Sequence, residues 1–169
     1  MAKHFKLTAE TKINIFGKTL YRIECVIDCK WAKAGDKGGW LEKEDNLSGY
    51  AWVSGNAEVS DDARVSGNAW VSGDARVSGD AWVSGDARVS GNAEVSGNAD
   101  YCCLQSFGSC DRTTSVFRQK DGTLRVRCGC FDGNLSEFAA KVAETHGDNK
   151  FGKEYRAMIE LIKIRFGLD

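Results

Sequence analysis

A group of arginines near the C-terminus is the part of this sequence best suited to bind an anion. Two runs typical of β-strands, 115–119 and 124–131, flank Asp121-Gly122, a dipeptide that favours a two-residue hairpin turn. With that turn, Arg118 lies directly opposite Arg125, and two such charges destabilise a sheet unless something neutralises them. Phosphate or carboxylate would do so, because the forked arginine side chain hydrogen-bonds both groups well. The predicted ligand-binding residues are Arg112, Thr114, Arg118, Arg125 and Arg127.

The alternative for these arginines is an ordinary solvated face of a two-sided sheet. In that interpretation nearby acidic residues, such as Asp111 and Asp132, neutralise the arginines and no ligand is required. The sequence leaves both interpretations open.

Cysteine is the second residue type that could carry chemistry, since the chain has seven. Thiolates and imidazoles are preferred ligands of zinc. However, the sequence has no Cys-x-x-Cys pair, and free cysteines commonly pack as small apolar residues. We therefore predict free thiols, with no metal and no cofactor. The residues that could form a zinc site instead are Cys102, Cys103, Cys110, Cys128, Cys130 and His146.

These residues follow a segment, 47–100, in which one six-residue pattern occurs nine times. Each repeat begins with a branched residue (Leu47, then Val), has Ala four places later, and usually contains Ser-Gly-Asn or Ser-Gly-Asp between them. The branched residue and the alanine fall on one face of an extended chain, and Gly, Asn and Asp accept the backbone of a tight corner. Asp61 is the one residue that replaces a corner glycine. A repeat this short must coil and stack to enclose a core.

These hexads resemble the hexapeptide-repeat family of left-handed β-helix proteins. The resemblance implies a triangular prism with three hexads per coil, so that nine hexads make three coils and residues eighteen apart are stacked. In this register the residues just before the valines stack in three columns: Trp52, Trp70 and Arg88; Glu58, Arg76 and Glu94; and Arg64, Trp82 and Asp100. The first column suits aromatic stacking and the second alternates in charge, and both features favour the register.

Tryptophans on the outside of such a prism need to be covered. Contact between subunits of a trimer would bury Trp52, Trp70 and Trp82, because flat solenoid faces with stacked aromatics suit such an interface. The alternative is that another part of the same chain covers them.

Residues 1–46 are predicted to cap the open end of the prism. The runs 12–16 and 20–26 flank Gly17-Lys18-Thr19 as a β-hairpin, and Leu41 lies six residues before Leu47, so we expect the first coil to begin there. A solenoid needs a cap of this kind to cover its terminal edge. The segment also resembles the entry segment of bacterial and phage hexapeptide proteins of the type assigned to acyltransferases or polymer-forming proteins.

Residues 101–169 predict a small module with a hairpin and two helices, in which 101–114 form a link or a last irregular coil. Asn134 and Glu137 form a capping-box pattern for a helix ending near His146-Gly147, and a second helix starts near Asn149. The phrase Arg127–Gly133 resembles a tail found on some phage hexapeptide proteins.

Together these segments predict a mainly β fold. It consists of a three-coil left-handed parallel β-helix (47–100), an N-terminal hairpin cap (1–46) and a C-terminal α+β module of ββαα order (101–169).

Composition narrows the possible partners. The formal net charge is −1 and acidic side chains outnumber basic ones in the repeats, so binding of duplex nucleic acid is not expected. No apolar run is long enough to cross a membrane, and we expect no signal peptide. Cysteines without an export signal favour a reducing compartment, so we expect a cytoplasmic protein, in the bacterial host cytosol if it is phage encoded.

Two classes of function remain. Acyltransferases of the hexapeptide family are trimers that bind acyl-CoA between prisms and use a histidine base, whereas His4 and His146, the only histidines here, both lie outside the repeats. We therefore favour a non-enzymatic homotrimeric scaffold of phage or prophage origin. Its C-terminal modules would bind a nucleotide, a phosphate ligand or a host protein, and so inhibit or sequester it. An acyltransferase using acyl-CoA is the alternative.

Overall fold

The computed structural model describes residues 3–168 and divides the chain into two compact units. The first, which we call the β-helix unit, ends at Asn98, and the second, the C-terminal unit, begins at Ala99. The cap and the coils thus belong to one unit. No helix in the described range is long and apolar enough to cross a membrane.

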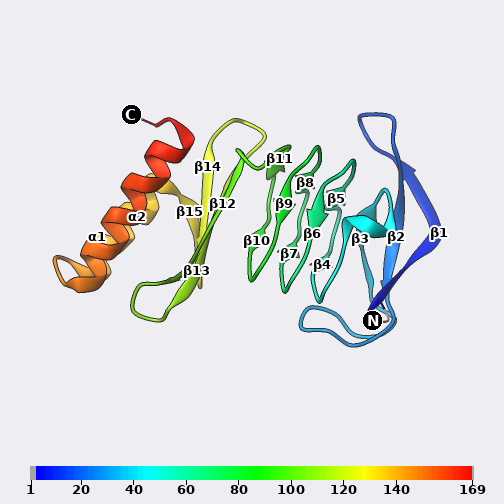
Figure 1. Ribbon diagram of the computed structural model, residues 1–169, viewed down its shortest axis with the longest axis horizontal. Coiled ribbons are helices and arrows are strands. Elements are labelled where there is room, and N and C mark those ends of the chain that lie inside the picture. The colour runs from blue at the N-terminus through cyan, green and yellow to red at the C-terminus, as the bar shows by residue number, and fades with distance from the viewer. Residues whose placement is uncertain (1–2, 169) are drawn as a thin grey trace. The chain divides into compact units, whose positions relative to one another are not determined.

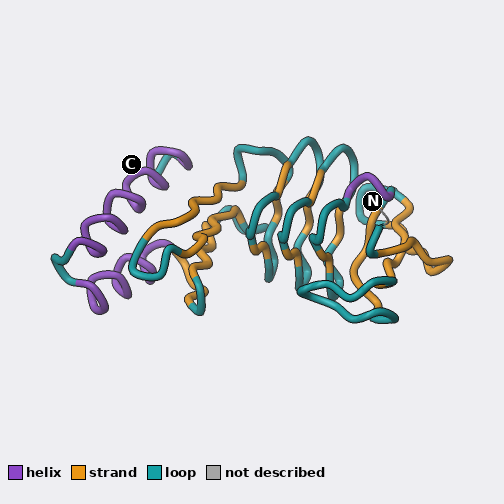
Figure 2. Tube along the Cα trace, turned by 60° about the horizontal axis from the view of Figure 1, so that its bottom comes forward, coloured by secondary structure: helices purple, strands orange, loops and turns teal. Residues whose placement is uncertain are grey.

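The repeats form a β-helix of short parallel strands, as the hexad pattern predicts (Figures 1 and 2). Each strand pairs with one eighteen residues away: Trp52 lies beside Trp70, and Val53 beside Val71. The valines of the repeats and the alanines from Ala51 to Ala93 are buried inside the coils. The strands are β4 (Trp52–Val53), β5 (Glu58–Val59), β6 (Arg64–Val65), β7 (Trp70–Val71), β8 (Arg76–Val77), β9 (Trp82–Val83), β10 (Arg88–Val89) and β11 (Glu94–Val95).

At Gly67, a corner of the coils, glycine is required because the next coil approaches closely. Gly67 has a φ of 68°, in the left-handed region that side chains disfavour. A Cβ atom at Gly67 would also lie 2.9 Å from the backbone nitrogen of Gly85 in the next coil. Both the local backbone and the stacking therefore exclude a side chain at this position.

The N-terminal segment forms the predicted hairpin, β1 (Phe5–Ile13) with β2 (Thr19–Cys25), followed by β3 (Lys37–Leu41). These strands extend one face of the prism, in the order β1-β2-β3-β5-β8-β11. Leu41 pairs in parallel with Val59, which confirms that the first coil begins before the regular repeats. A single 3-10 turn, Glu44–Asn46, leads into them.

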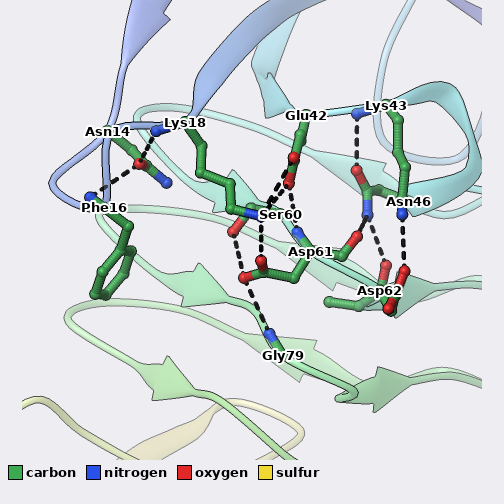
Figure 3. Close-up of polar contacts among 11 residues, drawn as sticks. Asn14, Phe16, Lys18, Glu42, Lys43, Asn46, Ser60, Asp61, Asp62 and Gly79 are labelled. Atoms are coloured by element: carbon green, nitrogen blue, oxygen red, sulfur yellow. Dashed lines mark hydrogen bonds and ion pairs between the residues drawn. The ribbon is translucent and has the colours of Figure 1, made fainter.

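The corner at Asp61 lies where the hairpin joins the coils (Figure 3). Asp61 adopts a φ of 59°, and its carboxylate accepts hydrogen bonds from the Lys18 ammonium and from the backbone nitrogen of Gly79, the latter at 3.3 Å. The backbone nitrogen of Asp61 donates to Glu42 at 2.6 Å, and Lys18 also pairs with Glu42 at 3.3 Å. The hydrogen bond from Lys18 is the main cause that lowers the pKa of Asp61.

The C-terminal unit is a four-stranded antiparallel sheet with two helices on one face. The sheet has two strands more than the sequence predicts, because part of the expected link forms β12 and a short strand follows β14. The elements are β12 (Tyr101–Phe107), β13 (Arg112–Arg118), β14 (Leu124–Cys128), β15 (Phe131–Asn134), α1 (Leu135–His146) and α2 (Lys150–Phe166).

Helix α1 begins at its predicted cap, and α2 begins where the sequence predicts, near Asn149. The side chain of Asn134 accepts a hydrogen bond from the backbone nitrogen of Glu137, whose carboxylate accepts one from the backbone nitrogen of Asn134. The side chain of Asn149 caps α2 by accepting from the backbone nitrogen of Gly152. The buried faces of the helices pack on Val116, Val126 and their neighbours to form the core of this unit.

Candidate functional site

The predicted arginine patch is not formed, because the hairpin register differs by one residue from the expected one. Phe117 lies opposite Arg125, and Arg118 lies opposite Leu124. Three residues, not two, form the turn before Thr123, and Gly122 has a φ of 83°. Since opposite residues share a face, Arg118 lies on the helix-facing side of the sheet and Arg125 on the other side.

Each of these arginines has partners within the C-terminal unit. Arg118 pairs with Asp100 at 3.3 Å and lies over the ring of Phe166 at 5.7 Å. Arg125 and Arg127 both pair with Asp132, at 2.6 and 3.5 Å. The hydrogen bond to Asp132 raises the pKa of Arg125. The neutralised face that we considered as an alternative therefore describes Arg125 and Arg127 better than a ligand site does.

Thr114 is also not available as a ligand-binding residue in this conformation. Its side chain is completely buried, and its hydroxyl oxygen has no hydrogen-bond partner within the described residues. It lies in the centre of the sheet between Leu104 and Cys128.

Arg112, another member of the predicted set, lines a cavity. The cavity is open to solvent, has a volume of about 540 Å³ and is lined by the β12–β13 turn, the β14–β15 turn and both helices. It contains polar and apolar side chains: Ser109, Cys110, Arg112, Cys128, Cys130, Phe131, Asp132, Phe138, Lys141, Val142, Thr145, His146 and Tyr155.

The side chain of Arg112 is held against the β14–β15 turn. A Cβ atom at Gly129 would lie 1.9 Å from Nη1 of Arg112, so the guanidinium occupies the space that this glycine leaves. Within residues 3–168, no carboxylate lies within ion-pair distance of Arg112, whereas Asp132 is shared by the two arginines named above. Arg112 is therefore a cation at a cavity without a carboxylate partner in the described chain.

The inner wall of the cavity is apolar and aromatic. Tyr155 stacks on His146 with ring centroids 5.5 Å apart and packs edge-on against Phe138 at 5.7 Å. The hydroxyl of Tyr155 lies 3.8 Å from the sulfur of Cys128, and burial raises the pKa of this tyrosine to about 12. A neutral phenol and two further aromatic rings thus form this wall of the cavity.

The seven cysteines are free. In the part of the chain that the structure describes, no three His, Cys, Asp or Glu side chains are close enough together to hold a metal ion. Cys110 and Cys130 are exposed, and they line the cavity with the buried Cys128.

The sequence analysis grouped four residues of this cavity, Cys110, Cys128, Cys130 and His146, but only as possible zinc ligands, and it did not predict the cavity. Lys141 and Tyr155 come from helices whose packing on the sheet a linear sequence does not reveal. One signal was available: Gly129-Cys130 between two strands is the Gly-first dipeptide of a two-residue hairpin turn. This signal predicts β15 and places Cys130 near the start of β13, where Arg112 lies.

The tryptophans predicted to form a subunit interface have three different environments. Trp52 is 2% exposed and packs against Gly38 in the cap. Trp70 stacks on Trp31, from the loop before β3, at 5.1 Å. Trp82 is 58% exposed. Trp52 and Trp70 are thus covered by their own chain, as the alternative interpretation held, and only Trp82 of the three is left for contact with another molecule.

Neither of the two histidines belongs to the coils. His4 is buried in the cap, where Nε2 lies 2.9 Å from the carbonyl oxygen of Ala51. His146 lies in the C-terminal cavity described above.

Comparison with protein families agrees with a repeat built from six-residue units. A model described as the YdcK beta solenoid repeat matches residues 57–73 and 69–85. The starts of the two matches are two hexads apart, and both matches lie within the stacked coils. A comparison with curated proteins gave no match. The coils and this match together identify the chain as a β-helix repeat protein.

Proposed function

We propose that the protein is a non-enzymatic binding protein, in which the C-terminal unit binds a small anionic molecule and the β-helix serves as a scaffold. The observation that carries this proposal is Arg112, a cation that lines a cavity of about 540 Å³ and has no carboxylate partner among the described residues. An arginine in such a position is well suited to a phosphate or carboxylate group.

The other side chains of the cavity indicate which chemical groups the ligand carries besides its anionic group. Phe131, Phe138 and Tyr155 provide aromatic surface, and the volume is in the range of small-molecule sites. The ligand class that fits best is a molecule with one anionic group and an apolar or aromatic body. A nucleotide, with its base on the aromatic wall and its phosphate on Arg112, belongs to this class.

Three further parts of the proposal rest on the resemblance to phage hexapeptide proteins. These parts are a trimeric assembly, a phage or prophage origin, and a role in which ligand binding sequesters or inhibits a host component. Acyl transfer with acyl-CoA is the competing function, and it would require a catalytic group on the outer surface of the coils.

Binding is tested by thermal melting of the full chain with inorganic phosphate, nucleoside monophosphates and aromatic carboxylates. We expect at least one aromatic anion to raise the melting temperature, because a ligand that binds only the folded state stabilises it. Arg112→Gln should remove this shift. The matched control is Lys163→Gln, which also removes one positive charge from the C-terminal unit but from the exposed side of α2, where Lys163 pairs with Glu160 at 2.7 Å.

If no anion of the panel shifts the melting temperature, or if Arg112→Gln and Lys163→Gln reduce the shift equally, Arg112 is not a binding residue. A shift with acetyl-CoA that survives Arg112→Gln would support the acyltransferase alternative instead.

A further inference from the structure

Two exposed thiols share the cavity with Arg112. Cys110 lies in the turn between β12 and β13, and Cys130 in the turn between β14 and β15. The sulfur of Cys110 is 3.8 Å from the hydroxyl of Ser109, and both residues line the cavity. The guanidinium of Arg112 packs on Gly129, the neighbour of Cys130 in its turn. The two cysteines and the arginine thus form a cluster, which we call the Cys110–Arg112–Cys130 cluster.

The charge of Arg112 is coupled to these thiols. The charge of a Cys110 thiolate and its hydrogen bond raise the pKa of Arg112, and Cys130 and Cys128 add to this in smaller measure. A thiolate, not a thiol, is the nucleophile in reactions of cysteine, and a neighbouring cation favours such reactions at an accessible site. The cluster therefore combines a nucleophile with a group that binds anions.

The other cysteines lack this combination. Cys25 and Cys128 are buried, and burial raises the pKa of the Cys25 thiol. Burial also raises the pKa of Cys102. Cys29 is half-buried in the β-helix unit. Only Cys110 and Cys130, of the described cysteines, are exposed.

We propose that the Cys110–Arg112–Cys130 cluster is a site of thiol–disulfide exchange with small acidic disulfides, with Cys110 as the attacking residue. This inference rests on the proposed function, since the same Arg112 would hold the carboxylate of the incoming molecule. The Cys110 thiolate attacks one sulfur of the disulfide, a new bond forms between them, and the bond between the two original sulfurs breaks. The second sulfur leaves as a thiolate with the electron pair of that bond, so Cys110 is oxidised and the leaving group is reduced.

The test compares three disulfides on the full-length reduced protein. Oxidised glutathione carries carboxylates, hydroxyethyl disulfide is neutral and cystamine is cationic. Intact mass and peptide mapping give the rate and the position of the adduct. We expect oxidised glutathione to modify Cys110 about fivefold faster than Cys29 of the same molecule, in keeping with a partly solvated charge interaction. For cystamine, the ratio of the Cys110 rate to the Cys29 rate should be smaller than for oxidised glutathione.

Variants separate recognition from reactivity. Arg112→Gln should abolish the preference for oxidised glutathione over hydroxyethyl disulfide at Cys110, and any loss of rate with the neutral disulfide should be smaller than the loss with oxidised glutathione. Cys110→Ser should remove the adduct, and Cys130→Ser should leave it in place. Equal rates for the three disulfides in the wild type, or a principal adduct at Cys130 or Cys29, would overturn the proposal.

The two proposals can fail separately. Cys110→Ser cannot form the adduct, but it retains Arg112 and should still show the melting shift with non-reactive aromatic anions. A shift in this variant without any selective adduct in the wild type would overturn the exchange reaction alone. A selective adduct at Cys110 in a protein that binds no other anion would support exchange and contradict the reversible ligand site.

Discussion

Trp31 and Trp70 stack with their ring centroids 5.1 Å apart and their planes inclined by 14°. The guanidinium of Arg88 also lies over the Trp31 ring, 5.2 Å from its centroid. The aromatic column that the repeats predict is therefore continued by a residue far away in the sequence. The loop before β3 covers this face of the prism, and the column stabilises the fold of the single chain.

The first prediction is that Trp31 is a stabilising residue. Trp31→Ala should lower the free energy of unfolding by about 2 kcal/mol, through lost apolar burial and the lost ring pair. Urea unfolding followed by circular dichroism measures this. Trp82→Ala is the control, because Trp82 is 58% exposed and its removal should cost less than about 1 kcal/mol. Equal losses for the two variants would contradict the stacking.

The second prediction concerns the proposed trimer, whose expected surface now centres on Trp82. Trp82→Glu should shift a trimer towards monomers without changing the fold, because a charge is costly in a dry interface. Analytical ultracentrifugation at micromolar concentration gives the mass. Trp70→Glu is not a clean test, since it also disrupts the contact with Trp31. A wild-type protein that sediments as a monomer would end the trimer proposal.

The third prediction is that acid lowers the stability of the folded cap because it protonates Asp61. Lys18 lowers the pKa of Asp61, so the ionised carboxylate stabilises the folded state above the ordinary pKa of aspartate, near ~4. This contribution is lost as the pH falls through the lowered value. Asp61 in turn raises the pKa of Lys18, so the contribution of the ammonium is fully present below the ordinary pKa of lysine and is lost as the pH rises through the raised value.

Asp61→Asn tests this without disturbing the corner, because asparagine also tolerates a positive φ and can accept from Gly79. The variant should be less stable than the wild type at pH 7, by about 1 kcal/mol for a weakened hydrogen bond to the Gly79 backbone. The difference should shrink below about pH 4, where the wild-type carboxylate becomes neutral as well. A difference that stays constant from neutral pH to about pH 3 would show that the charge of Asp61 is irrelevant.

The fourth prediction tests the inside and outside of the coils. Val71 is fully buried, so Val71→Asp should cost about 4 kcal/mol by placing an unpaired charge in the narrow core. Arg64 occupies the outward position just before Val65 and is exposed, so Arg64→Gln should cost less than about 0.5 kcal/mol. Chemical denaturation of both variants distinguishes them. Comparable losses would mean that the inside and outside of the coils are reversed.

The coils could be predicted from the sequence because each of their contacts repeats. The alternation of Glu58, Arg76 and Glu94 specifies an eighteen-residue stack, and these residues do pair side by side in neighbouring strands. The helix caps at Asn134 and Asn149 were equally predictable, since a cap depends on residues within one turn. Local and periodic interactions can therefore be predicted directly from the sequence.

The candidate site depended on a register that the sequence did not determine. Asp121-Gly122 favours a two-residue turn, but here Lys120 joins the turn, and Gly122 takes the left-handed position of a three-residue loop. A shift of one residue moves Arg118 to the opposite face from Arg125. The contacts of Trp31 and Tyr155 could not be foreseen either, because they join segments that are distant in the chain.

The close meeting of Gly67 and Gly85 has a consequence for the size of the β-helix unit. At these corners the backbone of one coil contacts the backbone of the next. Each coil therefore has the same contact surface for its neighbour, and neighbouring coils are about 4.8 Å apart, the spacing of paired strands. An in-frame duplication of eighteen residues after Ser90 would therefore add one coil, while the contacts of Lys18 with Asp61 and of Trp31 with Trp70 remain as they are. The β-helix can therefore gain whole coils while the contacts at its capped end stay the same.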